Sequence, residues 1–310
     1  MIAVLAVLAY AAAYLRRART LTRRGRPVPA ARIAAFLAGL VVLGIALSPP
    51  VHRAAEDTMA AHMVEHLVIG DFVSLLLVLG LTGPVLAPVL RVIPVRALRF
   101  AAHPAVALPL WGANFWLWHL PAAYEAALRH DGVHALQHAS FLLFGMNLWM
   151  PLFGPFPRPA WFGTGAQAAY VFAIRLTSMA LANLFLWSGT GFYAWYGRDL
   201  ADQEAAGAVM MAEDSVFMVG LFAWLAVRWM RDAEERQQLA ELSAARGLAV
   251  DERRIARAVA AGRGAALRRA MATSAPAPPG ANRRTDTVLH PTTAVDAAPR
   301  TRTVHRHGSR

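Results

Sequence analysis

Long apolar stretches alternate with short polar segments along the chain up to about residue 230. Seven of these stretches are candidates for membrane-spanning helices, and they cover residues 1–15, 33–49, 59–90, 103–121, 134–153, 166–188 and 205–229. A helix needs about 20 apolar residues to cross the hydrocarbon core of a bilayer, and most of the stretches approach that length. The pattern predicts an all-α, polytopic membrane helix bundle with about seven transmembrane helices.

The arginines between these stretches predict an orientation, because cytoplasmic loops of membrane proteins are enriched in basic residues. Seven arginines lie in residues 16–32 and fifteen lie after residue 230, whereas residues 50–58 and 122–133 contain one each. The excess alternates from loop to loop, apart from an uninformative loop at 154–165. The N-terminus is therefore expected outside and the C-terminal tail in the cytoplasm.

Composition agrees with a membrane protein and excludes some chemistry. The chain is 57% hydrophobic, has a mean hydropathy of +0.39 and contains no cysteine, so disulfides and thiolate metal sites are excluded. All 31 basic residues are arginine, and the net charge is +12. Because these arginines are concentrated in loops and in the tail, membrane topology explains them, and the expected surroundings are the lipid bilayer and not nucleic acid.

The composition changes after Met230. Residues 1–230 are expected to form the transmembrane domain. Residues 231–272 are rich in Ala, Arg, Glu and Leu, which favours a cytoplasmic or surface amphipathic helix. Residues 273–310 are rich in Pro, Thr and Arg and have few large apolar side chains, so they are expected to be a disordered tail.

Histidines are concentrated in one part of the chain, with eight of the eleven between residues 52 and 138. His62 and His66, and likewise His134 and His138, are spaced i, i+4, so the members of each pair lie on one face of a helix one turn apart. A rise of about 1.5 Å per residue puts both pairs about 6–12 Å from the outer boundary of the membrane. His119 falls at the outer end of the fourth stretch.

Thioethers and carboxylates are predicted at the same depth. The third stretch contains Met59, Met63 and Glu65, and the last contains Met210, Met211, Glu213 and Asp214. Imidazole, thioether and carboxylate together suit a late transition metal, and copper is favoured where Met joins His. The expected copper ligands are His62, His66, His119, His134, His138 and Met63.

Other interpretations of these residues stay open. Paired histidines on different helices also suit haem, which would make the protein a haem-binding membrane oxidoreductase. The sequence "HMVEH" at 62–66 matches the H-x-x-E-H pattern of inverted zinc peptidases, in which Glu65 would be the base. The second pair, "HALQH" at 134–138, has Gln137 in place of the acid and adds nothing that specifies a peptidase. A copper transporter would need methionines across the whole membrane, and these are not clearly present.

Two opposite charges fall within apolar stretches. Asp71 lies deep in the third stretch and Arg175 near the middle of the sixth, at comparable predicted depth. An ion pair would lower the cost of burying each charge, so a structural pair is the first hypothesis. The alternative is that Asp71 is part of a proton or ion path.

Several segments together suggest a family. These are "HMVEHLVIGDFVSLLLVLGLTGPVL" (62–86), "HP" (103–104) followed by "WHLP" (118–121), "HALQHASFLLFGMNLWMPL" (134–152) and "DQEAAGAVMM" (202–211). In this order they resemble the seven-helix, Bacillus-type CtaG family of cytochrome c oxidase assembly factors.

The resemblance implies a non-enzymatic chaperone for haem-copper oxidase in the bacterial plasma (inner) membrane, with copper delivery to the oxidase as its role and oxidase subunits as partners. It also implies that His62, His66, His119, His134 and His138 occupy the histidine positions of the family. Asp202 and Gln203 correspond to its DQ motif.

Overall fold

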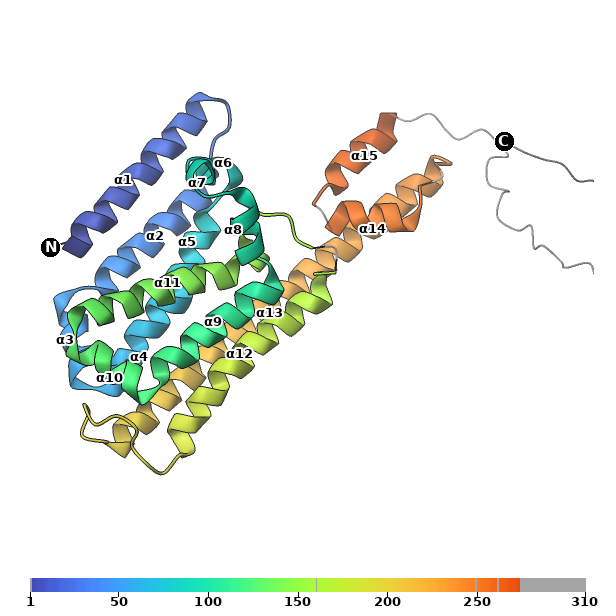
Figure 1. Cartoon of the computed structure of the whole chain (residues 1–310). Helices are drawn as coiled ribbons and strands as arrows, with labels where there is room; N and C mark the ends of the chain where they lie inside the picture. The colour runs from blue at the N-terminus through green and yellow to red at the C-terminus, as the bar shows by residue number, and fades with distance from the viewer. Residues whose placement is uncertain (1, 160, 249, 261, 274–310) are drawn as a thin grey trace, which may run out of the picture. The chain divides into compact units, whose positions relative to one another are not determined.

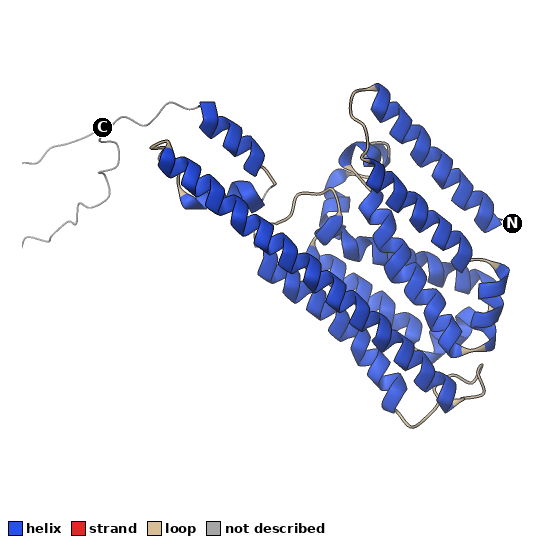
Figure 2. Ribbon diagram, turned by 180° about the vertical axis from the view of Figure 1, so that it is seen from behind, coloured by secondary structure: helices blue, strands red, loops and turns tan. Residues whose placement is uncertain are grey.

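The computed structural model describes residues 2–159, 161–248, 250–260 and 262–273. All of its regular secondary structure in these residues is helical, and no strand occurs among them (Figure 2). The all-α prediction is therefore confirmed. The elements are α1 (Ile2–Arg23), α2 (Ala30–Ala46), α3 (Pro49–Asp57), α4 (Met59–Leu67), η1 (Val68–Val73), α5 (Ser74–Gly80), α6 (Gly83–Leu86), α7 (Val89–Val92), α8 (Val95–Ala101), α9 (Pro104–His119), α10 (Pro121–Arg129), α11 (Asp131–Phe153), α12 (Thr164–Trp187), α13 (Leu200–Ala245), α14 (Glu252–Ala260) and α15 (Gly264–Thr273).

The described chain forms two compact units that divide after Arg231. In the first unit, α11 packs against α9, α5 and η1, and α2 packs against α5 and η1 (Figure 1). The second unit comprises the end of α13, α14 and α15, which enclose a small core of Leu239, Ile255, Val259 and Met271. The stretch 231–272, predicted as one surface helix, is thus divided into several helical segments, with Gly247 and Gly262 at positive φ between them. The tail predicted to be disordered lies outside the described residues from 274 on.

The third apolar stretch folds into α4, η1 and α5, and this helix is irregular in its middle. η1 is a π-helix, a wider turn that often occurs at functional sites. At this point α11 approaches very closely, because a Cβ on Gly145 would collide with the backbone oxygen of Gly70. Only glycine fits at position 145, and the contact holds α11 in a defined rotation against the α4–η1 segment.

The same helix ends earlier than the pattern predicted. It stops at Gly80 rather than at residue 90, because Leu81 and Thr82 are extended and Pro84 lies in the first turn of the short helix α6. The boundary agrees with the general rule that proline is tolerated at the start of a helix but not in its interior.

The first unit exposes many large apolar side chains and buries many polar ones. Val41, Leu143 and Val219 are each more than 60% exposed on α2, α11 and α13, whereas Arg175 and Asp214 are fully buried. Large numbers of exposed apolar side chains are typical of a surface that contacts a membrane or a partner. The distribution is compatible with helices that face lipid and hold their polar groups inside.

Each of the seven predicted stretches contains one main helix, formed by α1, α2, α4 to α5, α9, α11, α12 and α13. Among the described residues, three helices are both long and apolar enough to cross a membrane, namely Met59–Gly80, Thr164–Trp187 and Leu200–Ala245. A fourth results if Ala30–Ala46 and Pro49–Asp57, bent by 55°, form one span. Seven crossings and their direction therefore stay predictions.

Candidate metal centre

The helix that carries the first histidine pair is anchored at its N-terminus by two side chains. The hydroxyl of Thr58 accepts a hydrogen bond from Ala61 N at 3.2 Å. The carboxylate of Asp202, from the distant α13, accepts from Met59 N at 2.6 Å and from Ala60 N at 3.1 Å. These bonds satisfy N–H groups that a helix start leaves without partners, and the negative charge suits the positive end of the helix dipole. Asp202 therefore positions the segment that bears His62 and His66.

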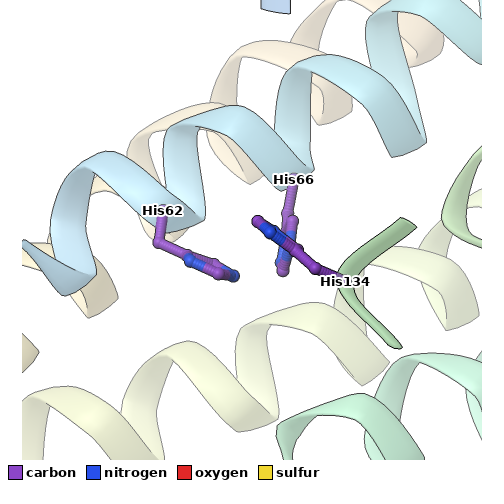
Figure 3. A group of neighbouring side chains, drawn as sticks. All are labelled: His62, His66 and His134. Carbon is purple, nitrogen blue, oxygen red and sulfur yellow. The ribbon is translucent and has the colours of Figure 1, made fainter. Parts of the chain in front are cut away.

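The two histidine pairs meet, and three of their members form a compact group. His62 and His66 on α4 point toward His134 on α11 (Figure 3). One ring nitrogen of each lies within 4.8 Å of the others. Two nitrogens bound to one ion at about 2.0–2.1 Å each are at most about 4.2 Å apart, so only a small side-chain adjustment separates this group from a metal site. We call His62, His66 and His134 the histidine triad.

His138 borders the triad. Its ring centroid lies 4.2 Å from that of His134 and 5.4 Å from that of His66. It also lies 3.7 Å from a carboxylate oxygen of Glu65, measured from His138 Nε2 to Glu65 Oε1. The two predicted histidine pairs, on α4 and α11, therefore form one connected set of four imidazoles.

Five ring nitrogens of this set lack hydrogen-bond partners within the described residues. The triad members are at most 6% exposed. His62 Nε2, His134 Nε2, His138 Nε2 and both nitrogens of His66 are buried and make no hydrogen bond within the described residues. Leaving a buried donor or acceptor unpaired costs about 1–3 kcal/mol, and native proteins rarely do so without a bound ligand or water. The residues present fit a metal ion held by neutral imidazoles.

A loop residue orients His62. The hydroxyl of Tyr196 donates to the backbone oxygen of Ala55 at 2.7 Å, so it is available as an acceptor for His62 Nδ1 at 3.3 Å. This arrangement assigns the proton of His62 to Nδ1 and leaves the lone pair of Nε2 for a ligand. Burial raises the pKa of Tyr196 above its ordinary value, which keeps the phenol protonated.

His119 and Met63 lie on another side of His66 and outside the triad. His119 Nδ1 donates to Phe115 O at 2.6 Å, which leaves Nε2 as the acceptor. His119, Met63, His66 and Met210 share the lining of a small cavity of about 20 Å³. The predicted six-residue ligand set is therefore divided between the triad with His138 and this neighbouring thioether-lined cavity.

Sequence reasoning missed one neighbour of the triad. His52, on α3, stacks on His134 with ring centroids 5.1 Å apart, and His52, Glu65 and His134 bring ligand atoms within 4.8 Å of one another. Its position in the first predicted outer loop, on the same side as both pairs, was the available signal.

The buried charged residues on η1, α12 and α13 form a second group. Asp71 and Arg175 lie 3.3 Å apart, and the same guanidinium lies 2.9 Å from Asp214 and 3.3 Å from Glu213. Arg175 also lies over the rings of Trp149 and Phe217. Glu213 and Asp214, predicted at the depth of the metal ligands, are thus placed around Arg175. We call Arg175 and its three carboxyl partners the arginine group.

Comparison with known proteins identifies the family of this chain. A family described as cytochrome c oxidase caa3 assembly factor (Caa3_CtaG) matches residues 12–232. The chain belongs to this family. Its members are named for assembly of an oxidase, and the description gives no support to the peptidase, transporter or haem-binding interpretations.

Three curated relatives of this chain are described as uncharacterized proteins. Uncharacterized proteins of Mycobacterium bovis and Mycobacterium tuberculosis are each 25% identical to it over 239 residues, covering 68% of this chain and 36% of the relative. A protein of Mycobacterium leprae is 23% identical over 242 residues. The chain thus spans about a third of the length of the curated relatives it matches. No solved structure matches it.

The DQ positions of this family member make contacts that shape the site. Asp202 caps α4, as described above. Gln203 binds the loop between α12 and α13 from both ends of its amide: Nε2 donates to Ser188 Oγ at 2.9 Å and Thr190 O at 3.0 Å, and Oε1 accepts from Phe192 N at 2.8 Å. This loop carries Tyr196, so the motif links the start of α13 to both the helix and the loop that position His62.

Proposed function

We propose that this chain is a membrane-embedded assembly factor for cytochrome c oxidase that binds copper transiently at the histidine triad and delivers it to the oxidase. Family membership supports the assembly role. The observation that carries the copper part is the convergence of three buried imidazoles from α4 and α11, four of whose ring nitrogens make no hydrogen bond within the described residues.

The chemistry of the donors supports copper as cargo. Imidazole suits copper, and thioethers add affinity for its reduced form. Met63 and Met210 line the cavity next to His66, so a soft donor environment adjoins the triad. Three imidazoles leave at least one coordination position for a donor from the receiving protein, and such an open set favours transfer over permanent retention. The chain acts in this proposal as a carrier and not as an enzyme.

The proposed placement is the bacterial plasma membrane, with seven crossings, the N-terminus outside and the tail in the cytoplasm. Support comes from the helix in each predicted stretch, from the exposed apolar side chains of the first unit and from the alternation of arginines between loops. In this orientation the histidine triad lies near the outer face, where copper for an oxidase would be handed over.

A complementation experiment tests the proposal. Membranes from a strain that lacks the gene are compared after complementation with wild type, His66→Ala or His130→Ala, by oxidase activity and by the reduced-minus-oxidised haem spectrum. His130 is an exposed histidine at the start of α11 without a side-chain capping bond, so it is the matched control. We expect activity to be lost with His66→Ala, while the haem a signal and the His130→Ala activity persist. Unchanged activity in the deletion strain would exclude the oxidase role.

A further inference from the structure

A second, larger cavity adjoins the histidine triad at His134. It has a volume of about 420 Å³, and its polar wall consists of His52, Glu65, Asp131, His134 and His138. Asp131 is exposed and the side chain of His52 is 40% exposed, so the cavity is reached from the end of the bundle where α3 and α11 begin. The remaining wall is apolar.

Glu65 is the unexplained residue of this cavity. It is 1% exposed, and neither of its carboxylate oxygens makes a hydrogen bond within the described residues. His138 Nε2 lies 3.7 Å from Glu65 Oε1, which is beyond hydrogen-bond distance. A buried carboxylate without hydrogen bonds is costly, and a bound cation removes that cost.

We propose that His52, Glu65 and His134 form a loading site, where a divalent late transition metal ion such as Cu²⁺ binds from the aqueous side before it reaches the histidine triad. This inference rests on the proposed function, because it assigns the route by which the triad is filled. The ligand atoms of the three residues lie within 4.8 Å of one another, as those of the triad do.

The shared member gives the transfer a simple geometry. The ring centroid of His134 lies 5.1 Å from that of His52 and 5.3 Å from that of His62, so it stands between the two groups. An ion moves inward by exchanging His52 and Glu65 for His62 and His66 while His134 stays bound. The metal keeps its oxidation state, and only metal–ligand bonds are formed and broken.

The loading site and the histidine triad differ in their ligands and in their exposure to water, and the difference favours binding first at the loading site. The loading site contains a carboxylate and a partly exposed imidazole, which suit a hydrated divalent ion arriving from water. Glu56, 3.6 Å from His52, and Asp131 add negative charge at the mouth, and clefts lined by one sign of charge speed the arrival of the opposite ion. The triad beyond is made of imidazole alone.

Two measurements on the purified full chain in lipid nanodiscs test the proposal, with Cu²⁺ as the probe. The first is the rate of loading by stopped-flow absorbance. We expect His52→Ala and Glu65→Gln each to slow loading by roughly tenfold, the low end of electrostatic steering effects, with the final stoichiometry unchanged. His130→Ala, the exposed histidine control, should load at the wild-type rate.

The second measurement isolates the loading site. With the triad disabled by His62→Ala and His66→Ala, one Cu²⁺ should still bind, with an electron paramagnetic resonance spectrum of mixed nitrogen and oxygen ligation, and adding Glu65→Gln should abolish it. A double variant that stays folded by circular dichroism and binds no Cu²⁺ would overturn the loading site, as would wild-type loading rates in both single variants. These outcomes leave the proposed function intact, since that function fails if wild type binds no copper, if the deletion strain keeps its oxidase activity or if His66→Ala supports full oxidase activity.

Discussion

The histidine triad and the arginine group are both buried among the helices of the first unit. They differ in whether their polar atoms have partners within the protein. The terminal nitrogens of Arg175 face carboxylates on η1 and α13, so its charge is matched within the protein. In the triad, His62 Nε2, His134 Nε2 and both ring nitrogens of His66 make no hydrogen bond within the described residues. A polar group that is satisfied internally holds helices together, whereas a group that is left incomplete is completed by a ligand. The comparison predicts different responses to mutation.

The largest effect is expected from Arg175→Ala, because it leaves buried carboxylates without their cation. Breaking a buried pair by removing one partner costs about 3–5 kcal/mol. The variant should accumulate poorly, and its thermal unfolding in detergent should begin well below that of wild type. Arg129→Ala is the matched control, since its pair with Glu125 is at the surface, with the Arg129 side chain 56% exposed, and such pairs contribute at most about 1 kcal/mol.

Asp71→Asn tests the arginine group by removing the negative charge of one of its three carboxylates. Reduced accumulation supports the structural ion pair, because the amide removes one of the three carboxylate charges that face the guanidinium and with it the link between η1 and α12. A variant that folds normally and alters oxidase assembly would instead favour the ion-path hypothesis for Asp71.

His66→Ala is expected to reverse this pattern, with a large loss of metal affinity and a small change in stability. Removing a direct ligand should weaken copper binding at least about 100-fold, the upper end of what loss of an outer partner costs. Chelator competition measures the affinity and thermal unfolding the stability. If His66→Ala destabilises as much as Arg175→Ala, the histidines are structural and the contrast between the two groups fails.

Tyr196→Phe is expected to have an intermediate effect on copper affinity. The substitution removes the acceptor that holds the proton on His62 Nδ1, and such outer partners contribute about 10–100-fold to metal affinity. Because burial raises the pKa of Tyr196, its phenol is protonated at both pH 7 and about pH 9, and the loss should be the same at both values. Tyr193→Phe is the control, since that hydroxyl donates to the backbone oxygen of His119 at 2.8 Å and touches no ring nitrogen.

The smallest effect is expected from Asp202→Asn, which weakens the cap of α4 without removing it. Loss of a helix cap costs about 0.5–2 kcal/mol, and the amide retains part of the bonding, so stability should fall toward the low end of that range. Copper affinity should fall with it, because α4 carries two triad members. Glu204→Gln, an exposed neighbour on α13, should change neither thermal unfolding nor affinity.

Much of the helical framework could be predicted from the hydrophobic pattern, because each main helix keeps its apolar residues within one stretch. Gly80, Gly83, Pro84 and Pro88 predict a kink or an end within the third stretch, and the helix does end at Gly80. Which of these residues ends it depends on the extended conformation of Leu81 and Thr82. The number of membrane crossings could not be predicted either, because α2 has 17 residues and α9 has 16, which is short for a span.

The sequence by itself determined the helical class, the family resemblance and the pairing of histidines on single helices, because these follow from local spacing. Only the tertiary structure decided that His62 and His66 lie next to His134, and that His52 and Glu65 lie near the same His134. It also decided that Glu213 and Asp214 pair with Arg175. The periodicity of a helix states which residues share a face but not which neighbour that face meets. The rotation is set by packing, as where Gly145 allows α11 to lie against the backbone of Gly70.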